Sequence, residues 1–414
     1  MRENRVILHI DMNNFYASVE CSLDPALRPY PVAVCGSEEE RHGIVLAKNY
    51  QAKAYGVKTG ESIREAKEKC RNLVIVPPHY GEYMKYSLLA REIYGRYTDL
   101  IEPYGMDEVW ADCTGSVRMF GDGETIANEI RETVKRELGL TVSVGVSFNK
   151  VFAKLGSDMK KPDAVTVIPR DGFREKIWGL PASDMLGVGR AAERQLAACG
   201  VHTIGDLARL PDETLRHKFG KIGVILWGCA NGLDCSPVTV RDTEALDKSA
   251  GHGMTALSDL ENDAEVWPFF LELSQELGHR LRVFRKKAHA ISIFVKDREL
   301  FCRQWQAPLP MPTQSASVIA EHAFALFCKS YDWHKPVRAL TVRAIGLESA
   351  GGATQFSLFD DPCRLEKTEH REEAVEEIRR RFGEMSIYPA ILMHIPKYPD
   401  HDNPKVQMPN GTGL

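Results

Sequence analysis

The chain has no long hydrophobic run, and this absence excludes a segment that crosses a membrane. A transmembrane helix needs about 18 or more consecutive apolar residues, and the sequence contains no such stretch. Residues 1–5 lead directly into a strand-like stretch and lack the hydrophobic centre of a secretory leader. We therefore expect a soluble protein of the cytoplasm that does not associate with membranes.

Paired cysteines are also missing. The ten cysteines include no Cys-x-x-Cys pair, and none lies near a histidine with zinc-finger spacing. This pattern argues against a disulfide framework and against a structural zinc site. It predicts reduced, mostly buried thiols.

An excess of positive charge is absent too, because the net charge is −4. This charge does not favour nucleic-acid binding, so any contact with a polyanion must come from local basic patches. Such runs are more often solvated helix faces than binding sites. Two are present: Lys150, Lys154, Lys160 and Lys161, and then Arg280, Arg282, Arg285, Lys286 and Lys287.

Strand-like runs alternate with amphipathic helices over the first 170 residues, which predicts a mixed α+β core rather than a helix bundle. The whole chain of 414 residues is long enough for several domains of about 100–200 residues each. The expected strands are 5–11, 31–35, 43–48, 73–77, 107–112, 142–147 and 164–168. The expected helices are 14–23, 62–70, 79–97 and 124–138.

The second half of the chain differs in character. Short helices are expected over 172–235, followed by a polar tether over 236–248. A strand, helix and strand pattern then occurs twice within 249–347, which predicts a small ferredoxin-like domain. Beyond it we expect a charged helix at 368–382 and a disordered, Pro-rich end.

The most informative feature is a set of acidic residues at the ends of apolar runs. Asp11 ends one run, and Asp107 with Glu108 opens another. If the two runs are neighbouring strands, the three carboxylates can meet at one edge of a sheet and would repel unless divalent cations neutralised them. That is the charge pattern of a two-metal phosphoryl-transfer site. Acids at strand ends are also common turn formers, so these segments alone leave both readings open.

The residues after Asp11 add to this pattern. A helix that begins there offers free backbone N–H groups and a positive dipole end, which suits a triphosphate. The backbone carbonyl of Met12 could bind a hard cation. Phe15 and Tyr16 are adjacent helix positions about 100° apart, so both cannot face the same core.

Four motifs in order resemble the Y-family (translesion) DNA polymerases of the DNA polymerase IV or DinB type. They are DMNNFYASVE at 11–20, YGMDE at 104–108, SVGVSFNKVFAK at 143–154 and DMKKP at 158–162. The resemblance covers roughly residues 4–347. It implies a palm (1–30 and 78–170), fingers (31–77), a thumb with a helix-hairpin-helix (171–240), a little finger (241–347) and a C-terminal tail (348–414).

The resemblance also implies roles for single residues. Asp11, Asp107 and Glu108 would be catalytic and would bind two Mg²⁺ ions, with the Met12 carbonyl as a further ligand. Tyr16 would be the steric gate against ribonucleotides, and Phe15 would pack near the incoming base and sugar. Tyr50, Lys53 and Lys161 would bind the triphosphate.

Three positions depart from the usual pattern. Lys53 stands where the family usually has Arg, which keeps the charge but loses bidentate geometry. Gly105 stands where relatives often have Ser, and Asn13 where they often have a second Asp. None of these changes removes a principal metal ligand.

DNA contacts are expected away from the carboxylates. Residues 186–196 resemble a helix-hairpin-helix hairpin, in which Gly187, Gly189 and Arg190 would approach a phosphate, although a lone Gly-x-Gly is usually just a turn. Lys248 and Ser249 lie in a segment that resembles the first DNA-facing strand of the little finger.

A short apolar peptide follows the last expected domain. Residues 355–359 resemble the peptide by which bacterial polymerases bind the sliding clamp, with Gln355, Leu358 and Phe359 as contacts. The alternative is a chance apolar pentamer in a linker, which would be exposed without a partner.

The sequence therefore predicts a monomeric translesion DNA polymerase that uses two Mg²⁺ ions, has low fidelity and lacks proofreading. Its partners would be primer-template DNA, a deoxynucleoside triphosphate (dNTP) and the bacterial sliding clamp. Two other functions stay open: a palm-type nucleotidyl cyclase, and a non-catalytic accessory protein that binds DNA or the clamp.

Overall fold

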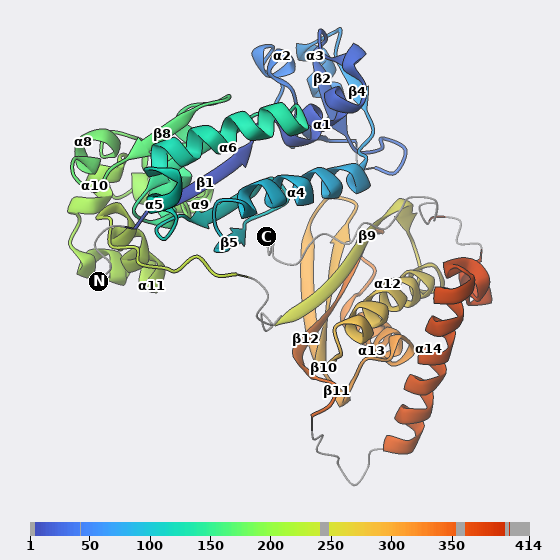
Figure 1. Ribbon diagram of the computed structural model, residues 1–414. Helices are drawn as coiled ribbons and strands as arrows, with labels where there is room; N and C mark the ends of the chain where they lie inside the picture. Colours follow the sequence, from blue (N-terminus) through green and yellow to red (C-terminus); the bar gives the residue numbers. More distant parts are fainter. Residues whose placement is uncertain (1–4, 42, 241–247, 353–360, 394–396, 398–414) are drawn as a thin grey trace. The chain divides into compact units, whose positions relative to one another are not determined.

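The computed structural model describes residues 5–41, 43–240, 248–352, 361–393 and 397. The chain forms two compact units, one built mainly from residues 1–244 and the other mainly from residues 245–404 (Figure 1). Within the described residues, none of the helices combines the length and apolar character of a membrane span.

A five-stranded sheet is the centre of the first unit, with the strand order β5-β6-β1-β7-β8. Its strands are β1 (Ile7–Met12), β5 (Ile101–Pro103), β6 (Glu108–Asp112), β7 (Val142–Ser147) and β8 (Val165–Ile168). β1 runs antiparallel to both β6 and β7. The expected pairing of the strand that ends near Asp11 with the strand that follows Asp107 is thereby confirmed.

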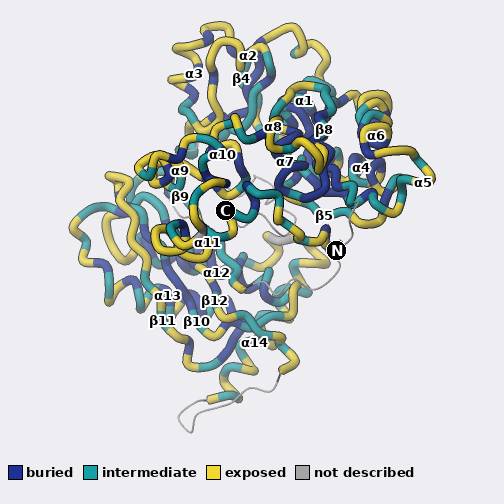
Figure 2. The backbone as a smooth tube through the Cα atoms, turned by 90° about the vertical axis from the view of Figure 1, so that its left-hand side faces the viewer, coloured by how far each residue is buried: buried dark blue, intermediate teal, exposed yellow. Residues whose placement is uncertain are grey.

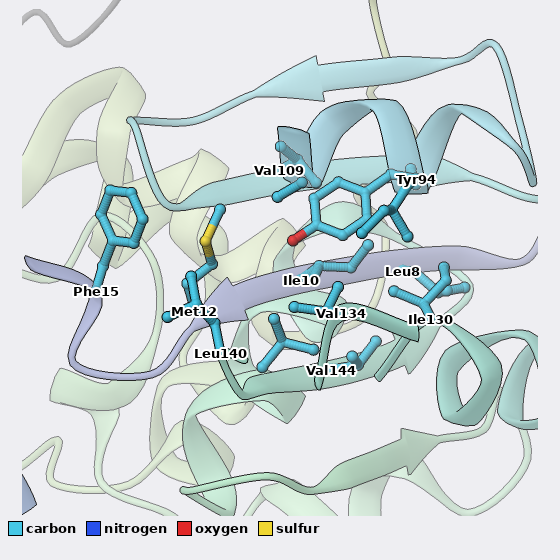
Figure 3. Close-up of a cluster of buried hydrophobic side chains, with 14 of the residues drawn as sticks. Leu8, Ile10, Met12, Phe15, Tyr94, Val109, Ile130, Val134, Leu140 and Val144 are labelled. Carbon is cyan, nitrogen blue, oxygen red and sulfur yellow. The ribbon is translucent and has the colours of Figure 1, made fainter. Parts of the chain in front are cut away.

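One face of β1 belongs to the main hydrophobic core. Leu8, Ile10 and Met12 are buried on this face, together with Tyr94 and Ile130 from two covering helices (Figure 3). These helices are α4 (Tyr80–Gly95) and α6 (Gly123–Leu138), close to the expected ranges. Because side chains point to alternate faces of a strand, every second residue of β1 packs against these helices.

The other face of β1 packs against α7 (Lys150–Met159), a helix that was not among the expected ones. Ile7 contacts Ala153 there, and His9 contacts Ser157. Asp11 lies on the same face because strand side chains at spacing two point the same way. The helix starts where the Asn149 side chain accepts a hydrogen bond from the Phe152 amide at 2.7 Å.

A glycine allows α7 to lie this close to the sheet. A Cβ atom on Gly145 of β7 would lie 1.9 Å from the carbonyl oxygen of Ala153 and 2.5 Å from the amide nitrogen of Ser157. No side chain fits such a gap. The position of α7 beside β1 therefore depends on this one residue.

A smaller sheet with the order β3-β2-β4 lies within residues 31–77, the range expected for the fingers. Its elements are β2 (Val32–Cys35), β3 (Val45–Lys48), β4 (Val74–Val76), α2 (Tyr50–Ala54) and α3 (Ile63–Lys69). The helix α3 is exposed along most of its length (Figure 2) and begins with a capping box between Ser62 and Glu65. Helix α1 (Phe15–Leu23) and the 3₁₀ turn Pro25–Leu27 connect β1 to this sheet.

The expected thumb is helical. Its elements are α8 (Phe173–Ile177), the 3₁₀ turn Ala182–Asp184, α9 (Arg190–Ala197), α10 (Ile204–Arg209) and α11 (Asp212–Ala230). The short helix α5 (Val117–Phe120) is not part of this region and lies between β6 and α6. Leu196, Ile204, Leu207 and Leu226 are buried in one cluster with Phe152 of α7. The same helix α7 therefore supports both the central sheet and the thumb.

Residues 236–240, which were expected to belong to a polar tether, pack on the first unit, and the rest of that range up to 247 lies outside the described residues. Val238 is buried beside Ile7. The amide of Thr239 donates to the Glu102 carboxylate at 2.9 Å, and Lys150 donates to the same group at 2.7 Å. Burial raises the pKa of Glu102, but these hydrogen bonds outweigh it and hold the pKa below its ordinary value.

The second unit has the expected strand and helix order, built on an antiparallel sheet β11-β10-β12-β9. Its elements are β9 (Ser249–Leu260), α12 (Asp263–Val283), β10 (Lys286–Asp297), β11 (Cys302–Thr313), α13 (Ala316–Ser330), β12 (Val337–Ser349) and α14 (Pro362–Phe382). The 3₁₀ turns Glu384–Ser386 and Ala390–Leu392 follow. α12 and α13 pack on one face of the sheet around Phe270, Leu277 and Phe327.

Helix α14 begins earlier than the charged helix that was expected at 368–382, and it packs on this second unit. The contacts are polar: Glu369 accepts a hydrogen bond from the Thr313 hydroxyl at 2.7 Å. Glu372 accepts one from the Ala316 amide at the start of α13, also at 2.7 Å. Carboxylates at a helix N-terminus are favourable there, so charge and not an apolar stripe holds α14.

We predict that Gly145→Ala lowers the free energy of unfolding by about 3 kcal/mol or more, because α7 must move off the sheet. Gly81→Ala is the matched control, since a Cβ atom on Gly81 would meet nothing within 4 Å. Chemical denaturation of both variants measures the difference. Equal stability of the two variants would show that α7 does not lie against β7 as described.

Candidate active site

Three carboxylates meet beside the central strand. Asp11 and Glu108 are direct partners in the register of β1 and β6. The amide of Met12 donates to the carbonyl oxygen of Asp107 at 3.0 Å, which fixes the start of β6 against the end of β1. Residues almost a hundred positions apart in the sequence are therefore brought together by one pair of strands.

An open cleft of about 380 Å³ lies at this point. The residues of the predicted site that line it are Asp11, Met12, Phe15, Tyr16, Asp107, Glu108 and Lys161. Five further residues complete the wall: Asn14, Leu46, Ala47, Lys48 and Thr59. The central sheet and the smaller sheet β3-β2-β4 thus share one cleft.

Two lysines hold the carboxylates. Lys161 Nζ donates to Asp11 Oδ2 at 2.6 Å and forms a second ion pair with Asp158 at 2.9 Å. Lys154 Nζ of α7 donates to Glu108 Oε2 at 2.8 Å. Of the four lysines in the basic run at 150–161, Lys154 and Lys161 therefore contact the carboxylates of the cleft.

Burial and mutual repulsion set the protonation of this cluster. Burial raises the pKa of Asp11 to about 7 even though Lys161 opposes the shift. Burial and the neighbouring charge of Glu108 raise the pKa of Asp107 to about 6. Burial acts the same way on Glu108, but His9 and Lys154 outweigh it and hold its pKa near 2. The surroundings therefore disfavour the state in which all three carboxylates are ionised.

The donor set suits a hard divalent cation. Within the described residues, no three His, Cys, Asp or Glu side chains are gathered closely enough to hold a metal ion as they stand. The oxygens of Asp11, Asp107 and Glu108 are nevertheless the ligand type that Mg²⁺ prefers. The raised pKa values of Asp11 and Asp107 show that added positive charge would be favourable there. The residues therefore fit the cations that were expected.

Tyr16 forms an aromatic wall of the cleft. Its ring stacks on Tyr83 with a centroid separation of 4.2 Å, and its hydroxyl lies 3.4 Å from the sulfur of Met106. Burial raises the pKa of Tyr16 to about 12, so the hydroxyl stays neutral. Phe15 is only 4% exposed and belongs to the core. Phe15 therefore borders the cleft from the core, whereas Tyr16 is the more exposed of the two aromatics that line it.

Tyr50 and Lys53 do not belong to the residues that line the cleft. Tyr50 begins α2, where the Asn49 side chain accepts a hydrogen bond from the Ala52 amide. Lys53 is exposed, with Nζ 5.6 Å from the ring centroid of Tyr50. Both belong to α2, outside the wall itself.

Lys48 and Thr59 were missed by the sequence analysis. Lys48 Nζ donates to the Thr59 hydroxyl at 2.9 Å, and burial together with the charge of Lys53 lowers the pKa of Lys48. The alternation of β3 could have indicated Lys48, because it shares a face with Leu46 two residues earlier. Thr59 carried no comparable signal.

Asn13 was noted only as a departure, but it organises the site. Its side-chain amide donates to Ser143 at 2.9 Å, and its oxygen accepts from the Asp163 amide at 2.9 Å. These bonds tie the end of β1 to the turn that follows Lys161. Gly105 has φ +123°, a conformation that favours glycine, and its carbonyl accepts from Arg91 at 3.0 Å.

The remaining predicted residues are not among those that line the cleft. Gly187 has φ +92°, Gly189 directly precedes α9, and Arg190 is the exposed first residue of that helix. Ser249 is the first residue of β9 in the second unit, and Lys248 directly precedes it. Gln355, Leu358 and Phe359 lie outside the described residues.

The sequence matches the impB/mucB/samB family over residues 10–158 and the C-terminal domain of that family over residues 247–358. Between them, residues 183–234 match the thumb domain of DNA polymerase-iota. Two similar curated proteins are a DNA polymerase IV of Acetivibrio thermocellus and the DNA polymerase IV 2 of Bacillus subtilis. The first is 53% identical, covering 94% of this chain and 98% of the relative. The second is 36% identical and covers 94% of each chain.

A solved structure agrees at the level of the fold. A Y-family DNA polymerase chimera superposes with a TM-score of 0.74 at 22% identity, covering 83% of this chain and 99% of the other. The matches together cover the central sheet, the helical thumb and the second unit. The chain therefore belongs to the Y-family of DNA polymerases, in the group of DNA polymerase IV.

Proposed function

We propose that the protein is a translesion DNA-directed DNA polymerase that extends a primer 3′-hydroxyl with a dNTP, at low fidelity and without proofreading. The observation that carries this proposal is the convergence of Asp11, Asp107 and Glu108 on one cleft. The names of relatives that align over nearly the whole chain support it. A cyclase or a non-catalytic accessory protein would leave a primer unextended, so one assay separates the three functions.

The cleft residues divide into those that hold cations and those that hold the nucleotide. Asp11, Asp107, Glu108 and the Met12 carbonyl would hold two Mg²⁺ ions. These ions would activate the primer hydroxyl and neutralise charge on the leaving pyrophosphate. Lys161 reaches Asp11 from the cleft wall. We infer that it turns to the triphosphate once Asp11 is neutralised.

Further nucleotide contacts would come from the fingers and from α1. Lys48 lines the cleft and adds a cation for the triphosphate. Tyr50 and Lys53 would bind the triphosphate as well, since the charges of Lys161 and Asp11 already act on the Tyr50 hydroxyl and Lys53 lies beside the Tyr50 ring. Tyr16, held rigid by its stack on Tyr83, would collide with a 2′-hydroxyl and so exclude ribonucleotides.

DNA and clamp contacts would lie on the other parts of the chain. We assign the palm to 1–30 and 78–170, the fingers to 31–77, the thumb to 171–240 and the little finger to 241–347. Gly187, Gly189 and Arg190 would bind a backbone phosphate, and Lys248 and Ser249 would bind another. Gln355, Leu358 and Phe359 would bind a bacterial sliding clamp, and this tether would raise the local concentration at primer ends.

We predict that Asp107→Ala and Glu108→Ala each reduce the rate of primer extension by at least about 100-fold, because each removes a carboxylate from the cation site. Glu129→Ala, an exposed substitution on α6, is the control and should leave the rate unchanged. Single-turnover primer extension in Mg²⁺ measures all three. Normal rates in both carboxylate variants would reject the proposed site.

The raised pKa of Asp107 predicts a stability effect that depends on pH. Protonation favours the folded state, so this stability is full below about pH 3.8 and is lost as the pH rises through about 6. Asp107→Asn should therefore raise the free energy of unfolding at pH 8 in EDTA by about 1–2 kcal/mol, and by much less at pH 4. Thermal unfolding at the two pH values measures this.

Added Mg²⁺ supplies the internal control for that experiment. It should raise the unfolding midpoint of the wild type more than that of Asp107→Asn, because the ion relieves the same repulsion. An Asp107→Asn variant that is less stable than the wild type at pH 8 in EDTA would contradict the account of the cluster.

The gate proposal gives a separate prediction. Tyr16→Ala should raise the incorporation of ribonucleotides relative to deoxyribonucleotides by about tenfold or more, since the clash disappears. Tyr55→Ala, at a side chain that is 54% exposed, is the matched control. Steady-state incorporation opposite a single template base gives the ratio, and an unchanged ratio for Tyr16→Ala would reject the gate.

A further inference from the structure

Glu20 is a buried carboxylate of α1 that has no assigned role. It is only 3% exposed, and an ionisable group so well shielded from water needs partners for its oxygens. Both partners come from the start of α4. The Tyr83 hydroxyl donates a hydrogen bond to Glu20 Oε1, and His79 Nδ1 lies 3.0 Å from each carboxylate oxygen. The carboxylate therefore joins α1 to α4.

Tyr83 connects this contact to the wall of the cleft. Its side chain is completely buried, and its ring stacks on Tyr16 with an angle of 11° between the two planes. Tyr83 does not itself line the cleft, so it lies behind Tyr16. Tyr16 and Glu20 are four residues apart on α1, and side chains at this spacing share one face of a helix. One residue of α4 thus contacts both.

The hydrogen bond fixes what the stack alone would leave adjustable. Aromatic pairs are favourable over a range of offsets, so a stacked ring can slide. Burial, together with the bond to Glu20, raises the pKa of the Tyr83 hydroxyl, which therefore keeps its proton and acts as the donor. A hydrogen bond to a carboxylate is stronger than one between neutral groups. Tyr80 adds edge contacts, with centroid separations of 5.8 Å to Tyr83 and 6.0 Å to Tyr16.

We propose that Glu20 is a positioning residue for the aromatic gate. It fixes Tyr83, and Tyr83 in turn fixes the plane and the depth of the Tyr16 ring in the cleft. The discrimination between deoxyribonucleotides and ribonucleotides is then set in part by a carboxylate that does not line the cleft. This role rests on the proposed function of Tyr16 as the gate.

Two substitutions of Glu20 separate this role from simple packing. Glu20→Gln keeps an oxygen that accepts from Tyr83, and its amide nitrogen can donate to Nδ1 of a neutral His79. Glu20→Leu has a similar volume but leaves the Tyr83 hydroxyl without an acceptor. A positioning role predicts that Glu20→Gln keeps the sugar discrimination and that Glu20→Leu loses part of it. A purely structural role changes the unfolding midpoint of the variants and leaves the discrimination as it is.

The experiment measures kcat/KM of the full chain for a dNTP and for the matching ribonucleotide opposite a single template base. Glu20→Leu should raise the ratio of ribonucleotide to deoxyribonucleotide incorporation about threefold or more, and Glu20→Gln should stay within about twofold of the wild type. Glu92→Leu, an exposed substitution on the same helix α4, is the control and should leave the ratio unchanged. An unchanged ratio in Glu20→Leu, or an equal rise in Glu20→Gln, would overturn the proposal.

Tyr83→Phe keeps the test decisive if Glu20→Leu folds less well, because it removes only the hydroxyl and retains the stack. It should raise the same ratio by about threefold or more, and an unchanged ratio would overturn the proposal. In the double variant with Glu20→Leu the rise should be no larger than in either single variant, since both act through one bond. Two effects that multiply would contradict this.

Tyr16→Ala separates failure of the proposal from failure of the gate. An unchanged ratio in Tyr16→Ala would overturn the gate and, with it, the role of Glu20. A raised ratio in Tyr16→Ala, with unchanged ratios in Glu20→Leu and Tyr83→Phe, would overturn the role of Glu20 alone.

Discussion

The repulsion among three carboxylates is the constraint on which the site depends. The antiparallel pairing of β1 with β6 places Asp11 opposite Glu108, and Asp107 precedes that pair by one residue. The ionised forms of these carboxylates are unfavourable in the folded chain, because burial holds the pKa of Asp11 and Asp107 above their ordinary values. Lys154 and Lys161 offset part of the charge. The negative charge that remains favours the binding of cations in the cleft. The carboxylates therefore lower the stability of the fold while they provide the groups that the activity needs.

The same strand builds both the fold and the site. Leu8, Ile10 and Met12 hold β1 to the helices of the core (Figure 3). Ile7, His9 and Asp11 lie on the opposite face of the strand, which α7 covers. The close contact at Gly145 fixes α7, and α7 in turn carries Lys154, which donates to the Glu108 carboxylate. Precision at the cleft therefore comes from rigid elements packed on both faces of one strand.

Local patterns in the sequence predicted the elements that carry their own signal. Acids at the ends of apolar runs pointed to the strand pair, and helical spacing predicted α1, α3, α4 and α6, whereas α2, α5 and α7 were not predicted. Contacts between distant segments had no such signal, so the pairing of Lys154 with Glu108 and the bonds of Asn13 to Asp163 could not be foreseen. The docking of α14 was missed because carboxylates hold it, and a helix without an apolar stripe looks solvated in sequence.

The most direct test of the central claim is a crystal structure of the protein with primer-template DNA, a non-hydrolysable dNTP and Mn²⁺. The account predicts two anomalous peaks at about 2.0–2.3 Å from carboxylate oxygens of Asp11, Asp107 and Glu108, with Lys161 moved from Asp11 to the triphosphate. Nucleotide bound in the cleft with no anomalous peak beside these carboxylates, and with Lys161 still on Asp11, would contradict it.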